Sequence, residues 1–291
     1  MSKMKNADPE RLRKDVEFLC RLHPPRNHSN LISLNKAAKY IQFGFQNAGL
    51  VAGLQHWSTS GNIYSNVLAA YQPEKQRRLI LGAHYDVYGD LPGADDNASG
   101  VAGLLETARI VTKLLPEIDY RIDFVAYSLE EPPFFGRKEM GSYVHAESLF
   151  EQKADVIGMI CYEMIGHYSA DGNTKRHFPS EVDIEFPENS NNFVGAISIK
   201  KYESFNRQFF EWTKEENPHR VGFVSFPDDT HGPSLSDNRN YWRFGYPALM
   251  LNSGPSGRNP NYHQATDTPD TLNYEVMAEV VTAITGACLR F

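Results

Sequence analysis

Residues 78–115 constrain the fold more than any other part of the chain, because they read as a strand, a loop and a helix in succession. The run RLILGAHY is largely apolar and β-prone, which is typical of a strand buried on both faces. The later run ASGVAGLLETARIVTKLL has the apolar spacing of a helix. A strand that leads through a loop to a helix is the repeating unit of α/β folds, so the segment predicts a parallel sheet.

The remaining segments extend the same pattern. YRIDFVAYS, ADVIGMICY and PALMLN each read as a further strand. We also expect strands near residues 51–57 and 66–71, and helices over about 9–22, 33–49, 98–115, 203–216, 240–245 and 274–290. The resulting prediction is a three-layer α/β/α fold around a central mixed, mostly parallel sheet. The 291 residues suffice for one domain, 1–291, and the polar stretch 167–192 is expected to be a surface insertion.

Side chains with metal-ligating chemistry follow four of these strands. His84 and Asp86 end the first strand on one face, and the loop after it contains Asp95 and Asp96. The other candidates are Glu130 and Glu131, Glu163, and His263. In open α/β sheets, ligands bind beyond the carboxyl ends of the strands, so we expect these groups to converge on one metal centre. Asp86 is placed to orient the imidazole of His84.

Each of these residues has a simpler interpretation when it is taken alone. His84 fits a hydrogen-bonded core histidine, and the Glu130–Glu131 pair fits a solvated loop. Asp95 and Asp96 fit a turn or an N-cap for the following helix, and local chemistry does not say which of the two would bridge metal ions. The combination of all five positions is what favours the metal centre.

In this combination the chain resembles the co-catalytic di-zinc aminopeptidases, a group that includes bacterial secreted aminopeptidases and is related to glutamate carboxypeptidase and glutaminyl cyclase. The resemblance rests on the matching motifs, which are His84-x-Asp86, the loop GADDNASG at 93–100, Glu130-Glu131, Glu163, and Asn261-Tyr262-His263 with Asp267-Thr268 behind it. These separated positions occur in the order of the family. The resemblance implies a single zinc peptidase domain.

The resemblance also implies a role for each residue. Asp96 would bridge two Zn²⁺ ions, with His84 and Glu163 completing one metal site and Glu131 and His263 the other. Glu130 would act as general base on a metal-bridging hydroxide, and Asp86 would be the second catalytic residue. Tyr262 would donate a hydrogen bond to the oxyanion. The best-known members carry Asp where this chain has Glu163, which is one methylene longer.

The implied activity is a zinc-dependent aminopeptidase that removes N-terminal residues from peptides. Three alternatives stay open: a glutaminyl-cyclase-like acyltransferase with one zinc, a carboxypeptidase selecting acidic ends, and a binding protein on this scaffold.

Four other residues have two possible roles each. Asp237 fits a helix cap or a partner of a metal-bound group, Arg258 fits a substrate anchor or a loop cover, and Phe134 and Phe135 fit a pocket wall or ordinary packing.

Composition excludes some classes of partner. The net charge of −7 argues against nucleic acid or an anionic membrane surface as a main partner. The three cysteines, Cys20, Cys161 and Cys288, suggest no disulfide framework. The first residues lack the apolar stretch of a signal peptide, and no run has the length of a membrane span. We therefore expect a cytoplasmic protein, or a secreted one if a leader was removed; the sequence does not indicate an oligomeric state.

Overall fold

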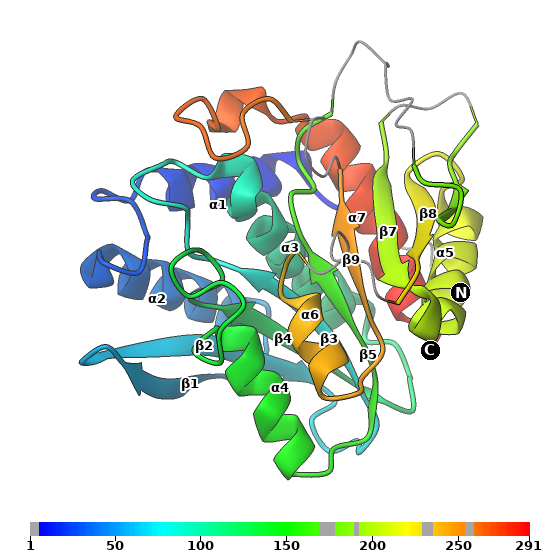
Figure 1. The fold of residues 1–291 in the computed structure, drawn as a ribbon, viewed down its shortest axis with the longest axis horizontal. Coiled ribbons are helices and arrows are strands. Elements are labelled where there is room, and N and C mark those ends of the chain that lie inside the picture. The colour runs from blue at the N-terminus through cyan, green and yellow to red at the C-terminus, as the bar shows by residue number, and fades with distance from the viewer. Residues whose placement is uncertain (1–5, 169–177, 189–191, 229–234, 254–258) are drawn as a thin grey trace.

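The strands of the chain pair into one mixed sheet (Figure 1). The computed structural model describes residues 6–168, 178–188, 192–228, 235–253 and 259–291. Within these residues the strand order is β1-β2-β4-β3-β5-β9-β7-β8-β6. The strands are β1 (Ala52–Thr59), β2 (Asn62–Tyr71), β3 (Arg78–His84), β4 (Arg121–Tyr127), β5 (Val156–Tyr162), β6 (Asp183–Glu185), β7 (Val194–Ile199), β8 (Val221–Phe226) and β9 (Ala248–Asn252).

The strands at the centre of the sheet are parallel, and the strands on either side include antiparallel pairs. Strands β4, β3, β5 and β9 run parallel to their neighbours in this group, which brings their carboxyl ends to one edge. Antiparallel pairs flank this centre, β1 with β2 and β2 with β4 on one side, and β9 with β7 on the other. The mixed α/β sheet expected from the sequence is confirmed.

Helices cover both faces of the sheet (Figure 1). They are α1 (Pro9–Cys20), α2 (Leu31–Asn47), α3 (Gly100–Leu114), α4 (Gly141–Glu151), α5 (Glu203–Glu216), α6 (Asn238–Arg243) and α7 (Tyr274–Cys288). The larger core contains residues of α1, α2, α3, α5 and α7, and the smaller core on the other face contains residues of α4 and α6. The three-layer arrangement is therefore confirmed.

Local chemistry accounts for several helix ends. Pro9 occupies the first turn of α1, and the carboxylate of Asp8 accepts the backbone N–H groups of Glu10 and Arg11. Asn273 accepts the N–H of Val276 at the start of α7. Helix α4 was not predicted, because its apolar residues do not form one face: Phe150 is 56% exposed.

The expected insertion at 167–192 is described by the structure only in part. Its described residues include β6, which pairs antiparallel with β8 and forms the last strand of the sheet. Such a three-residue strand is too short to produce a recognisable alternation of apolar and polar residues. Among the described residues, no helix combines the length and apolar character needed to cross a bilayer.

A buried ion pair joins α1 to α3. The fully buried carboxylate of Glu106 contacts the guanidinium of Arg11, and it lies 3.2 Å from that of Arg109. Burial alone would raise the pKa of Glu106, but the hydrogen bonds from Arg11 and from the N–H of Asp8 hold it below its ordinary value. The carboxylate therefore stays ionised between two cations.

We expect Glu106→Ala to lower the free energy of unfolding by about 3 kcal/mol, because it leaves the two guanidinium groups without their shared partner. Chemical denaturation at neutral pH measures the change. Glu10→Ala, at an exposed position of α1, is the control and should change the value by less than about 0.5 kcal/mol. Equal effects of the two substitutions would show that this ion pair does not stabilise the fold.

Candidate metal centre

Three of the predicted ligands meet beyond the end of β3. His84 is the last residue of this strand, and Glu163 follows β5 directly. The Nε2 atom of His84 lies 3.3 Å from Oδ1 of Asp96 and 3.3 Å from Oε2 of Glu163. One ligand atom from each residue falls within 4.8 Å of the others, which is a spacing that suits a single metal ion.

A second group of three adjoins the first and shares Asp96 with it. Nε2 of His263 lies 3.2 Å from Oδ2 of Asp96 and 3.5 Å from Oε1 of Glu131. The two oxygens of Asp96 thus face two different histidines, each of which has its own glutamate. These five predicted ligands come from separate segments of the chain, and the structure brings all of them together.

The neighbouring carboxylate, Asp95, is turned away from both histidines. Its Oδ1 accepts the backbone N–H groups of Gly166 and His167, and its Oδ2 accepts the side-chain amide of Asn259. The geometry therefore separates Asp95 from Asp96, which the local sequence could not do. The helix-cap interpretation of the pair is wrong, because neither carboxylate caps α3. The cap residue of this helix makes no side-chain hydrogen bond, and the N–H of Gly100 is accepted by Oδ1 of Asn97.

Asp86 holds the backbone of the glutamate pair. Its two oxygens accept the N–H groups of Glu130 and Glu131, each at 3.1 Å. Its distance to Nδ1 of His84 is 3.6 Å, which is longer than a hydrogen bond. Asp86 therefore lies next to the imidazole, as expected, but its hydrogen bonds position the loop after β4.

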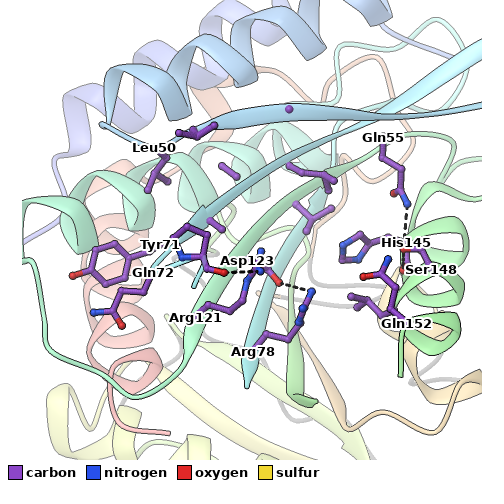
Figure 2. A pocket seen from close by; sticks show the side chains of 18 of the residues that line it. Leu50, Gln55, Tyr71, Gln72, Arg78, Arg121, Asp123, His145, Ser148 and Gln152 are labelled. Carbon is purple, nitrogen blue, oxygen red and sulfur yellow. Dashed lines mark hydrogen bonds and ion pairs between the residues drawn. The ribbon is translucent and has the colours of Figure 1, made fainter. Parts of the chain in front are cut away.

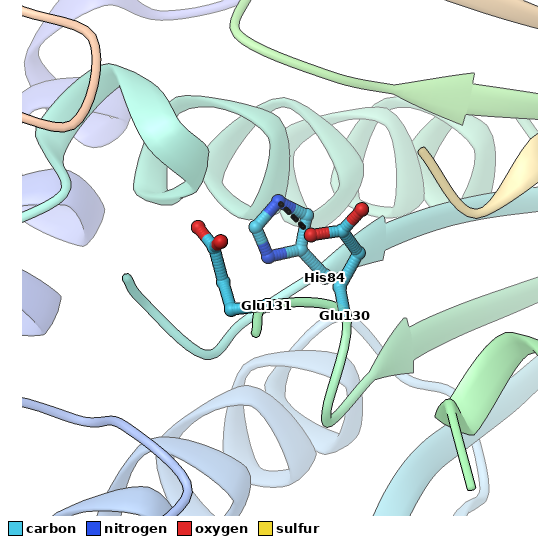
Figure 3. Close-up of side chains that lie close together, drawn as sticks. All are labelled: His84, Glu130 and Glu131. Atoms are coloured by element: carbon cyan, nitrogen blue, oxygen red, sulfur yellow. Dashed lines mark ion pairs between the residues drawn. The ribbon is translucent and has the colours of Figure 1, made fainter. Parts of the chain in front are cut away.

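Figure 3 shows Glu130 and Glu131 on either side of His84. Oε2 of Glu130 lies 3.9 Å from Nε2 of His84, and both glutamates are buried. Burial, together with the negative charges of Glu131 and Glu163, raises the pKa of Glu130 well above its ordinary value despite the opposing effect of His84. Burial and the charge of Asp96 raise the pKa of Glu131 to about 7.

Aromatic rings hold His263 from both sides. Tyr88 stacks on one face with centroids 4.1 Å apart, and Tyr262 stacks on the other at 3.9 Å. Burial lowers the pKa of His263, but its contacts with Asp96 and Glu131 outweigh burial and raise the value to about 9. Tyr262 is 43% exposed at the edge of the centre, where it can contact a bound molecule.

Two further residues position the loops, and the sequence analysis assigned them no role. Asp267 accepts the backbone N–H groups of Asp95 and Asp96 at 2.9 and 3.1 Å. The fully buried guanidinium of Arg26 donates to four carbonyl oxygens, those of Leu19, Tyr85, Pro92 and Gly93. No local pattern marks Arg26, because all of its partners are carbonyl groups whose position depends on the tertiary fold.

Ser236 and Asp237 lie behind Glu163. The hydroxyl of Ser236 donates to Oε2 of Glu163 at 2.6 Å, which fixes the longer side chain. Asp237 stands at the N-terminus of α6 but makes no capping hydrogen bond, so the cap interpretation is wrong. It is completely buried, and burial raises its pKa to about 7.

The remaining candidates have other contacts or lie outside the described residues. Phe134 is buried, with its ring 5.6 Å from that of His28 and 6.1 Å from that of Tyr64, which is ordinary packing. Phe135 lies under the guanidinium of Arg239. Arg258 falls outside the described residues, so its two readings stay predictions.

The donor set fits divalent cations. Both ring nitrogens of His84 and Oε1 of Glu131 are buried without a hydrogen-bond partner in the described structure, and buried polar atoms of this kind are rare unless a ligand meets them. Imidazole nitrogens with carboxylate oxygens are typical ligands of Zn²⁺ and similar ions. Fold and centre together define the class: an α/β protein with adjoining groups of metal-ligating side chains beyond the carboxyl ends of its parallel strands.

The chain belongs to peptidase family M28, whose family model matches residues 66–287. It is 37% identical over 289 residues to the uncharacterized protein YfbL of Escherichia coli (strain K12), covering 96% of this chain and 87% of that protein. It is also 26% identical over 224 residues to a probable leucine aminopeptidase of Trichophyton verrucosum, covering 74% of this chain and 54% of that relative.

Solved structures share the fold. A leucine aminopeptidase precursor from Bacteroides thetaiotaomicron superposes with a TM-score of 0.75 at 18% identity, covering all of both chains. A glutaminyl cyclase from the same species, bound to N-acetylhistamine, superposes with a TM-score of 0.74 at 18% identity, covering 99% of this chain and all of that one. At this level of identity the two structures establish the fold and do not discriminate between the two activities.

We expect Arg26→Met to unfold the protein at a temperature at least about 5 °C lower, because four buried carbonyl groups lose their donor. Thermal unfolding followed by circular dichroism measures the shift. Arg21→Met, at a side chain that is 75% exposed, should leave the midpoint within about 1 °C. An unchanged midpoint for Arg26→Met would contradict the anchoring role.

Proposed function

We propose that the protein is a zinc-dependent exopeptidase that removes N-terminal residues from peptides. The observation that supports this proposal best is the position of Asp96, whose two carboxylate oxygens face His84 and His263 at 3.3 and 3.2 Å. A carboxylate shared between two histidine–glutamate pairs is suited to bridge a pair of cations. Membership of family M28 makes peptide bonds the expected target.

In this proposal His84 and Glu163 complete one zinc site, Glu131 and His263 complete the other, and Asp96 belongs to both. Bound zinc would polarise the scissile carbonyl and lower the pKa of the attacking water. The hydrogen bond from Ser236 sets the direction of the Glu163 carboxylate, which supports its inclusion in spite of the longer side chain.

Glu130 is the proposed general base. It is buried beside both zinc positions, and its backbone is held by Asp86. A carboxyl group whose pKa is raised by burial can take a proton from water and return it to the leaving amine near neutral pH. Tyr262, at the exposed edge of the centre, is the proposed donor to the oxygen of the scissile carbonyl.

The sign of the local charge supports a preference for the N-terminus of a peptide. Buried carboxylates dominate the centre, and such surroundings favour a free α-ammonium group over a carboxylate. The positive charge of Arg26 offsets this preference only in part, and its guanidinium donates its hydrogen bonds to carbonyl oxygens of the loops. An acidic-end carboxypeptidase is the second candidate. It is favoured by the positive charge of Arg239, which is half-buried and interacts electrostatically with Glu130.

We expect protein purified without chelator to contain about two zinc ions per chain and to release N-terminal residues in a chelator-sensitive reaction. Elemental analysis gives the metal content, and His263→Ala should reduce it to about one ion. Peptides with an acetylated N-terminus should resist cleavage, whereas those with an amidated C-terminus should be cleaved normally. The opposite substrate pattern would indicate the carboxypeptidase, and one ion with cyclisation of N-terminal glutamine would indicate the cyclase.

We expect Glu130→Gln to keep its zinc content and to lose about 10²- to 10⁴-fold in kcat, because the amide cannot accept the proton. Glu151→Gln, at an exposed position of α4, is the matched control and should keep the parent rate. Steady-state kinetics and elemental analysis on the same samples separate loss of the base from loss of metal. A parent-like kcat for Glu130→Gln would remove Glu130 from this role.

A further inference from the structure

A large pocket lies at the opposite end of the sheet from the metal centre (Figure 2). Its volume is about 740 Å³, which is within the usual range for small-molecule sites. Arg78 and Arg121, the first residues of β3 and β4, line it, whereas His84 ends β3. Six residues of strand span roughly 20 Å, so the pocket is not part of the metal centre.

The pocket exists because α4 covers only part of its face of the sheet. On the strand side, Gly53 of β1 pairs with Leu68 of β2, and both residues line the cavity. A Cβ atom added to Gly53 would meet nothing within 4 Å, so the wall is open there. On the opposite side, Ser148 and Leu149 of α4 complete the lining.

Two guanidinium groups and one carboxylate form the charged part of the lining. Arg78 and Arg121 are direct neighbours in the parallel register, and like charges so placed repel each other. Asp123 lies between them: its Oδ1 accepts Nε and Nη2 of Arg121 at 2.8 and 2.6 Å, and its Oδ2 is 3.6 Å from Nη1 of Arg78. One positive charge is left without compensation from this cluster.

The uncompensated charge lies mainly with Arg78. Its Nε atom is buried and has no hydrogen-bond acceptor in the described structure, whereas Arg121 makes two bonds to Asp123 and one to the carbonyl of Pro73. The other titratable groups in the lining are His145 and Tyr71. Burial and the two arginines lower the pKa of His145 to about 3, and burial raises the pKa of Tyr71 above its ordinary value. Both side chains are therefore neutral at pH 7, and the net charge of the lining is +1.

The rest of the lining is mostly apolar. Leu50, Leu68, Val125 and Leu149 contribute hydrocarbon surface, and Gln55 donates to the hydroxyl of Ser148 near them. A ligand that matches both parts has one anionic head group and an apolar body. An inorganic ion would leave the apolar wall exposed to water, and a neutral apolar molecule would leave Arg78 without an acceptor.

We propose that this pocket binds a small organic anion, with a carboxylate or phosphate head group at Arg78 and an apolar body between β2 and α4. The head group pairs with the guanidinium of Arg78, whose side chain is 17% exposed, and neutralises the excess charge. A charge-assisted hydrogen bond of this kind is about twice as strong as a neutral one, so it determines the selectivity for anions. The site is independent of the proposed peptidase activity.

Calorimetric titration of the zinc-loaded protein with octanoate, octyl phosphate and octanamide tests the proposal. At least one of the two anions should bind with a Kd at least about tenfold lower than that of octanamide, the neutral counterpart of octanoate. Comparing octanoate with octyl phosphate distinguishes the two head groups. Failure of both anions to bind, or equal affinity for octanamide, would overturn the proposal.

Variants locate the binding. Arg78→Gln should weaken binding of the anion at least about tenfold and leave octanamide unchanged, whereas Arg77→Gln, at a side chain that is 46% exposed, should alter neither. Gly53→Leu narrows the pocket on its apolar side and should weaken anion binding at least about tenfold even if Arg78→Gln does not fold. Anion binding that is unchanged by Gly53→Leu would place the ligand elsewhere, at the metal centre above all, and would refute the site.

Discussion

The structure depends on burying many carboxylates in one small volume. Each is at most 6% exposed, and they are Asp86, Asp95, Asp96, Glu130, Glu131, Glu163, Asp237 and Asp267. Buried carboxylates are costly unless cations or hydrogen-bond donors meet them. Two histidines and Arg26 supply only part of the positive charge, and the pKa values of about 7 at Glu131, Asp237 and Asp267 reflect the deficit. Bound divalent cations would remove it, which is why this geometry favours a metal centre.

Backbone N–H groups supply most of the other donors, and they do so in pairs. Asp86 takes two from the loop after β4, and Asp95 takes two from the loop after β5. Asp267 takes two from the loop that contains Asp96. Each carboxylate thus joins its own loop to another one. A ligand is positioned by a carboxylate from a different segment, so the centre is organised as one unit.

The sequence predicted that these side chains would converge because they follow strands, and the carboxyl ends of parallel strands share an edge. It could not separate Asp95 from Asp96, since the difference lies in contacts with Gly166 and Asn259, 71 and 164 residues away. Arg26 and β6 were missed for a similar reason. The bonds of Arg26 go to distant carbonyl groups, and β6 is defined only by its pairing with β8.

The parallel register of β3 and β4 brings chemically similar segments side by side at both ends of the two strands. His84 pairs with Tyr127, next to the loop that carries the glutamate pair, and Arg78 pairs with Arg121 at the other end. At the carboxyl edge, loops and cations can compensate the gathered charge. At the amino edge, Asp123 compensates only one of two arginines, and α4 leaves the site open. The parallel register thus gathers charged side chains at both edges of the sheet, and the two edges differ in what compensates them.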